Sequence, residues 1–154
     1  YIRSIILQGC EARLSRSSRR AQKHTDFTSK DIDEYLNKIR KCVRENKYSI
    51  SLNENRNENM EFIEDYRIDT QKEKEILLSL THKNFCYAVD NNNPKFPNEK
   101  LYVFCKRFQL ENWGLIESVN IYIKTNKLET KNGDDFVVVI SMHKLKKPMK
   151  FLFK

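Results

Sequence analysis

The stretch that decides the fold is SVNIYIKTNKLETKNGDDFVVVISMHK, residues 118–144. It contains two runs rich in β-branched and aromatic residues, a composition typical of strands. Asn132-Gly133 separates the runs, and this dipeptide is the strongest short-range signal for a two-residue type I′ turn, because both central positions need positive φ. The stretch therefore predicts a β-hairpin that turns at Asn132-Gly133.

The register of this hairpin brings four polar side chains to one face. A turn centred on Asn132-Gly133 pairs Tyr122 with His143 and Lys124 with Ser141. Alternation along the strands directs these four side chains to one side of the sheet. The opposite, core-facing side is expected to carry Ile121, Ile123, Ile140 and Met142.

This group of side chains matches the needs of RNA cleavage without a metal. One group must deprotonate the 2′-hydroxyl, another must protonate the leaving 5′-oxygen, and a cation must hold the charge that builds on phosphorus. His143 can act as acid or base, Lys124 can steady the charge, and Tyr122 can orient the nucleotide. The alternative is that Tyr122 and His143 form only a cross-strand surface pair.

The rest of the chain predicts helices followed by neighbouring strands. Amphipathic helices are expected at about Lys30–Glu45 and from Thr70, with an Asn/Glu-rich loop before the second. Their caps are expected to be Thr28 or Ser29 for the first helix and Thr70, with Glu73 in a capping box, for the second. Strands are expected at 47–52, 85–89, 101–108, 118–126 and 135–143, with a possible edge strand at 149–154. We therefore expect an α+β domain over residues 28–154, with helices packed on a mostly antiparallel, strongly twisted sheet, preceded by a basic, loosely ordered arm at 1–27.

The composition favours a polyanionic partner. The 154 residues carry a net charge of +8, which favours nucleic acid first, an acidic protein second and an anionic membrane third, unless the lysines are merely surface residues. No apolar run reaches the length of a membrane span, and nothing shows export. The four cysteines are far apart, so we expect mostly buried, reduced thiols in a cytoplasmic protein. The three histidines lack metal-ligand spacing, so we expect no metal site and no cofactor. His24 and His82 are expected not to be catalytic. His82 is expected at a helix end, where it can cap carbonyls.

The order of elements and the motifs LTHKNF, VNIYIKT and VVVISMHK resemble the MqsR family of mRNA interferase toxins, over about Asp31–Lys147. The resemblance implies a RelE-like fold, metal-independent cleavage of mRNA, and an antitoxin or immunity partner. Tyr122 and His143 stand where that family has its catalytic tyrosine and its final catalytic lysine. Tyr87 stands near the place of another catalytic lysine, with Lys83 one helical turn before it.

Several basic residues are candidates for RNA contacts. The expected RNA-binding residues are Lys83, Tyr87, Lys106, Arg107 and Lys144. Three other functions remain open: a non-catalytic module that binds RNA or DNA, the toxic tip of a larger polymorphic toxin, and an adaptor that binds an acidic protein. Loss of turnover without loss of binding on removal of His143 would separate the nuclease from the binding module.

Overall fold

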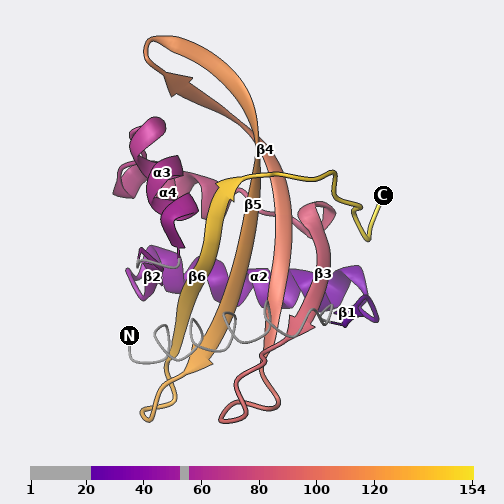
Figure 1. The fold of residues 1–154 in the computed structure, drawn as a ribbon. Helices are drawn as coiled ribbons and strands as arrows, with labels where there is room; N and C mark the ends of the chain where they lie inside the picture. The colour runs from indigo at the N-terminus through magenta and orange to yellow at the C-terminus, as the bar shows by residue number, and fades with distance from the viewer. Residues whose placement is uncertain (1–21, 53–55) are drawn as a thin grey trace.

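The computed structural model describes residues 22–52 and 56–154. Within these residues, six strands form one sheet in the order β1-β3-β4-β5-β6-β2, and every pair is antiparallel except β2 with β6. The strands are β1 Lys23–His24, β2 Tyr48–Ile50, β3 Phe85–Asp90, β4 Lys100–Asn112, β5 Leu115–Glu129 and β6 Asp135–Lys144. The helices are α2 Ser29–Arg44, α3 Asn57–Asp65, α4 Thr70–Leu78 and the 3₁₀ turn η2 His82–Asn84. The fold is α+β, as predicted, and α2 crosses one face of the sheet while α3 and α4 lie toward the β6–β2 side (Figure 1).

Helix α2 forms where its sequence predicts it. The Thr28 hydroxyl accepts a hydrogen bond from the Asp31 amide at 3.1 Å, and the Asp31 carboxylate accepts one from the Thr28 amide at 2.8 Å, which completes a capping box. Residues at helical spacing along α2 are fully buried against the sheet: Ile32, Leu36, Ile39 and Val43. The face of the sheet that α2 covers, here the helix face, therefore carries the main core.

The other face of the sheet, here the far face, carries a smaller apolar cluster. Its buried members are Leu101, Leu128, Val138 and Ile140, with Val89 and Phe136 packed against them. The helix-face core instead takes the alternate residues of the same strands, including Ile121, Ile123 and Met142. Both faces of the central strands are thus partly apolar, and the polar residues of the far face are gathered beyond this cluster.

The turn between β5 and β6 is one residue longer than predicted. Thr130 and Asp134 close the loop, and Gly133 has φ +81, as a type I turn followed by a left-handed residue requires. The predicted two-residue type I′ turn is therefore wrong. This loop alone would shift the strands by one residue and separate Tyr122 from His143.

A β-bulge in β6 restores the predicted pairs. Thr125 lies opposite Val139 and Lys124 lies opposite Ser141, so Ile140 is the extra residue between them. Beyond the bulge Tyr122 lies opposite His143, as predicted. Ile140 was expected on the helix face, but it joins the far-face cluster, because the bulge interrupts the alternation of β6.

Four other predictions are corrected by the structure. The Asn/Glu-rich segment was expected to be a loop, but it contains α3. The N-cap of α4 is Asp69 and not Thr70, and the Asp69 carboxylate accepts a hydrogen bond from the Lys72 amide. Residues 149–154 form no strand, although the Leu152 amide donates to the Phe85 carbonyl at 3.0 Å. Lys23–Phe27 belong to the folded unit, since β1 pairs with β3 and the Phe27 ring packs on Phe85. The predictions for Cys10 and for the arginines before residue 21 lie outside the described residues.

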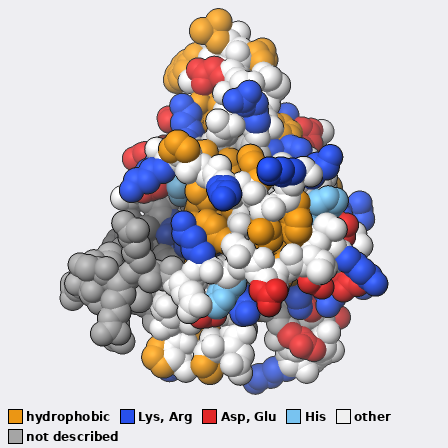
Figure 2. All heavy atoms as spheres, turned by 90° about the vertical axis from the view of Figure 1, so that its right-hand side faces the viewer, with side chains coloured by type: hydrophobic (Ala, Val, Ile, Leu, Met, Phe, Trp, Pro, Cys, Tyr) orange, Lys and Arg blue, Asp and Glu red, His pale blue; other side chains and the backbone are white. Residues whose placement is uncertain are grey.

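The β4–β5 hairpin extends beyond the rest of the sheet, and its tip is apolar and exposed (Figures 1 and 2). Trp113 is 82% exposed at this tip, beside Leu115 and Ile116, and the Arg67 guanidinium lies over its ring. None of the helices among residues 22–52 and 56–154 is both long enough and apolar enough to cross a bilayer.

Candidate active site

The predicted catalytic side chains share one end of the far face. Cys105, Tyr122 and His143 lie opposite one another across β4, β5 and β6. Lys124 comes next along β5 on the same side of the sheet. The polar group that the hairpin register predicted is therefore present, and side chains from β3 and α3 extend it.

The rings of Tyr122 and His143 stack. Their centroids are 5.1 Å apart and their planes are 17° from parallel. On its other side Tyr122 is hydrogen-bonded through its hydroxyl to Tyr87 of β3. Burial first, and then the neighbouring Tyr87, raise the pKa of Tyr122, so this hydroxyl stays protonated. Tyr122 is thus fixed from both sides.

Glu58 of α3 is an unexpected member of the site. One of its carboxylate oxygens lies 3.3 Å from Nε2 of His143, and the other lies 2.5 Å from the ammonium of Lys146. The hydrogen bond from Lys146 and then the charge of His143 lower the pKa of Glu58. Nδ1 of His143 is 2.8 Å from the carbonyl oxygen of Lys144. The two ring nitrogens thus lie near different oxygen atoms, Nδ1 near the backbone and Nε2 near Glu58.

Two further cations lie near this pair. Burial, reinforced by the charge of Arg56, lowers the pKa of Lys124 to about 8. Burial also lowers the pKa of Arg56, while the nearby Tyr122 and Glu58 act in the opposite direction. Lys124 thus exchanges protons close to neutral pH, whereas a guanidinium stays charged.

The buried side chain of Asn59 joins helix α3 to β6. The Asn59 amide nitrogen donates to the carbonyls of Ser51 at 2.8 Å and Ile140 at 3.0 Å, and its oxygen accepts from the Met142 amide at 2.9 Å. These bonds satisfy the edge of β6 at the bulge. They also fix the position of Asn59, the neighbour of Glu58. The same hydrogen bonds therefore position the Glu58 carboxylate and hold β6, the strand that carries His143.

Sequence reasoning missed Arg56 and Glu58 because it assigned their segment to a loop. A signal was present in the helical spacing of Asn59, Phe62, Ile63 and Tyr66, which face inward. Its first member is an asparagine, which an apolar pattern search passes over.

The predicted RNA-binding residues are divided between the two faces. Tyr87 and Arg107 lie on the far face, with Arg107 Nε 3.4 Å from the side-chain oxygen of Asn120. Lys106 faces the helices and donates to the Ser79 carbonyl at 3.2 Å. Lys144 lies beside α3 with its ammonium 5.2 Å from the Tyr66 ring centre, and Lys83 is exposed on η2. Lys106 and Lys83 are therefore not brought into the group around His143, whereas Lys144 lines a small cavity together with His143 and Glu58.

The other two histidines have carboxylate partners away from this group. His24 Nε2 lies 3.0 Å from Asp90, and His82 Nδ1 lies 2.9 Å from Asp33. His82 was expected to cap backbone carbonyls, but it pairs with Asp33 instead. The thiols of Cys42, Cys86 and Cys105 are buried and free, and burial raises their pKa, to about 12 for Cys86. These three cysteines match the prediction of buried, reduced thiols.

The fold and site define an α+β protein with a cluster of acid–base and cationic side chains on one sheet face. Comparisons with protein-family models, with curated proteins and with solved structures found no match for this chain. The resemblance to the MqsR family therefore stays a prediction based on short motifs.

Proposed function

We propose that this protein is a metal-independent endoribonuclease that cleaves mRNA through attack of the 2′-hydroxyl, as an mRNA interferase toxin of RelE-like fold acting in the cytoplasm. The observation that carries the proposal is the convergence of a histidine, a carboxylate, a lysine of lowered pKa and an arginine on one side of a tyrosine-lined face. A cognate antitoxin or immunity protein neutralises the enzyme.

His143 is the general acid in this proposal. The Lys144 carbonyl engages Nδ1, so Nε2 is the ring nitrogen turned toward Glu58, and in this proposal it carries the proton that is transferred. The contact with Glu58 is an ion-pair distance of 3.3 Å, and a substrate oxygen can approach the same nitrogen. His143 transfers this proton to the 5′-oxygen as the phosphorus–oxygen bond breaks.

Lys124 is the general base, and Arg56 holds the charge. With its pKa near 8, a substantial fraction of Lys124 is neutral at slightly alkaline pH and can take the proton of the 2′-hydroxyl. Lys124 and His143 are diagonal neighbours across β5 and β6, a relation in which backbone positions are about 7–8 Å apart, so in this proposal the acid and the base flank one phosphate. The guanidinium of Arg56 stabilises the pentavalent phosphorus, and Tyr122 orients the nucleotide. The products are a 2′,3′-cyclic phosphate and a 5′-hydroxyl.

The test is cleavage of single-stranded RNA by the purified protein in EDTA, with analysis of the product ends. We expect His143→Gln to lower the rate by about 10²–10⁴ while RNA affinity stays unchanged. A substrate with hydrogen in place of the 2′-hydroxyl at the cleavage site should be inert. Cleavage of that deoxy substrate, or full inhibition by EDTA, would refute the mechanism.

The variant Lys124→Arg tests whether Lys124 acts as a general base or supplies only positive charge. Arginine keeps the charge but does not lose its proton in the working pH range, so this variant should be as inactive as His143→Gln. A variant that keeps more than about a tenth of the wild-type rate would show that Lys124 supplies charge alone. RNA binding without any turnover by the wild-type protein would favour the non-catalytic binding module.

A further inference from the structure

A pocket lies beside the site, between the start of the domain and its C-terminal segment. It has a volume of about 530 Å³ and is lined by Lys23 and Thr25, by Cys86 and Tyr87 of β3, and by the segment Pro148–Leu152. This size is within the range of small-ligand sites, about 300–1,000 Å³. None of the predicted catalytic residues lines it.

The segment after β6 forms one wall by crossing the sheet. It begins beside β5, where the Leu145 amide donates to the Asn120 carbonyl at 2.8 Å. It ends beside β3, where the Leu152 amide donates to the Phe85 carbonyl at 3.0 Å, so it crosses in front of β5 and β4 on its way to β3 (Figure 1). Hydrogen bonds at both ends hold this wall in place over the pocket.

Tyr87 joins the pocket to the proposed active site. Its ring lines the pocket, and its hydroxyl is hydrogen-bonded to Tyr122, whose other side stacks on His143. A chain molecule that places one group near His143 can therefore place the next group in the pocket.

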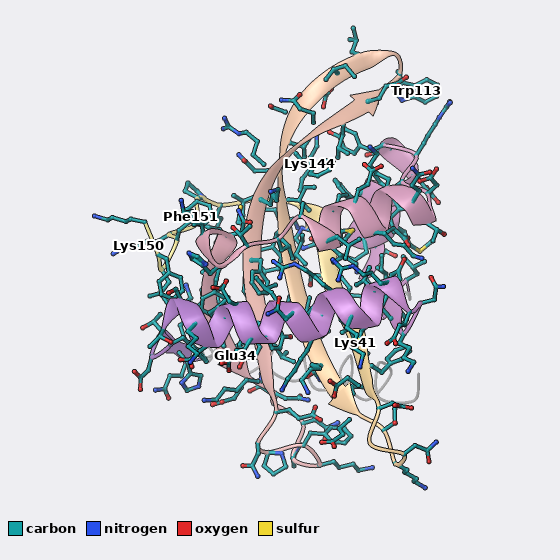
Figure 3. The ribbon with its side chains drawn as sticks, turned by 180° about the vertical axis from the view of Figure 1, so that it is seen from behind. Glu34, Lys41, Trp113, Lys144, Lys150 and Phe151 are labelled. Atoms are coloured by element: carbon teal, nitrogen blue, oxygen red, sulfur yellow. The ribbon has the colours of Figure 1, made fainter. Side chains whose placement is uncertain are left out.

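The lining has the chemistry of a nucleotide site. Tyr87 and Phe151 supply aromatic surface, and Phe151 is 44% exposed despite its size. The ammonium of Lys23 lies 4.5 Å from the Tyr87 ring centre, and Lys150 adds a second cation beside Phe151 (Figure 3). Figure 2 shows hydrophobic side chains surrounded by Lys and Arg on this side of the molecule. Aromatic rings between cations are the pattern that binds single-stranded nucleic acid, through stacking on bases and contact with phosphates.

We propose that this pocket binds one base of the RNA substrate, that of a nucleotide flanking the scissile phosphate. The inference rests on the proposed ribonuclease function and adds a base subsite to it. The base stacks against Phe151 and the edge of Tyr87, while Lys23 and Lys150 contact the adjoining phosphates. A base held here would fix the position of the phosphate between Lys124 and His143.

The test uses uncleavable 2′-O-methyl oligonucleotides in which one base at a time is removed. Binding is measured by fluorescence anisotropy with the wild-type protein and with Phe151→Ala, whose exposed position makes the variant safe for folding. For the wild type, loss of the base at one position should weaken binding about 5-fold or more, the size of one base–aromatic stack. Phe151→Ala should weaken binding of the intact oligonucleotide similarly and should be insensitive to removal of that same base.

Matched controls separate the subsite from general effects. Leu115→Ala removes an exposed apolar side chain at the distant hairpin tip and should leave the abasic pattern unchanged. Lys23→Gln should lower affinity for every oligonucleotide equally, because it removes a phosphate contact and not a base contact.

The two proposals fail in different ways. If the wild type cleaves RNA but Phe151→Ala and removal of the base lower the affinity additively, the base subsite is refuted and the ribonuclease proposal stands. Coupling between Phe151 and one base in a protein that never cleaves RNA would support the pocket and overturn the ribonuclease. Absence of abasic sensitivity at every position of the oligonucleotide would likewise overturn the base subsite.

Discussion

Nε2 of His143 lies 3.3 Å from a carboxylate oxygen of Glu58, although the two residues are far apart in the chain. The His143 backbone belongs to β6 and Glu58 belongs to the first turn of α3. The contact forms because α3 packs on the edge of β6 just past the point where β2 ends. It gives the histidine a charged partner that no local sequence pattern connects to it.

Glu58→Gln should lower the rate of RNA cleavage by about 10²-fold without changing KM, because the amide no longer supplies the charge that orients the His143 ring. The measurement is kcat against pH for both proteins. A residue with only a structural role would change stability and leave the shape of the pH profile unaltered. An unchanged profile for Glu58→Gln would therefore remove Glu58 from the site.

The same variant tests the ion pairs of Glu58. Because folding lowers the pKa of this carboxyl below its ordinary 4.5, its charge stabilises the protein above about pH 4.5, and this contribution is lost as the pH falls through the lower folded value. The difference in urea midpoint between wild type and Glu58→Gln should therefore shrink below pH 4. The effect should be small, since the side chain is 46% exposed and solvent screens its partners.

Asn59→Ala should destabilise the protein by about 2–4 kcal/mol, because it leaves the Ser51 and Ile140 carbonyls and the Met142 amide without their buried partner. Chemical denaturation measures this loss. Asn57→Ala, at an exposed position on the same helix, is the matched control and should change stability by less than about 0.5 kcal/mol. Equal effects of the two variants would show that α3 is not anchored through Asn59.

The hairpin explains how much of the fold was predictable. Periodicity and strand composition located α2 and the four long strands, because these signals are local. The predicted pair of Tyr122 and His143 is correct, but two errors cancel: the loop is one residue longer than the turn signal indicated, and the bulge at Ile140 adds one residue back. The position of a bulge depends on what packs on the strand, here Asn59 of α3. No sequence pattern within β6 therefore predicts it.

The site was predicted only where it is local to the hairpin. Tyr122, Lys124 and His143 share one face because of strand alternation, which sequence determines directly. Glu58 and Arg56 arrive through the packing of α3, and the parallel pairing of β2 with β6 that places α3 is a contact between distant segments. No local sequence pattern predicts the pairing of β2 with β6.

Two adjacent basic residues of β4 should differ in RNA binding, because they lie on opposite faces of the sheet. Arg107 is on the far face, whereas Lys106 faces the helices and caps the Ser79 carbonyl. Arg107→Gln should reduce the slope of log affinity against log salt by about 0.7, the value for one phosphate contact with a single strand. Lys106→Gln should leave that slope unchanged. Filter binding over a salt series makes the comparison, and equal slopes for both variants would place the RNA elsewhere.

Lys124→Met should stabilise the folded protein at pH 7 while it abolishes cleavage. A lowering of the pKa of Lys124 from its ordinary 10.5 to about 8 corresponds to about 3 kcal/mol of penalty on the charged form in the folded state, an upper estimate of the gain. The penalty is complete below pH 8, where the folded protein carries the ammonium in a partly buried position. It disappears as the pH rises from about 8 to 10.5, because in that interval the folded chain has lost a proton that the unfolded chain still binds.

Urea midpoints should therefore show that Lys124→Met is much more stable than the wild type at pH 7 and only slightly more stable at pH 9.5. A methionine variant less stable than the wild type at both pH values would mean that the Lys124 charge is well compensated, and such a lysine would be a poor general base.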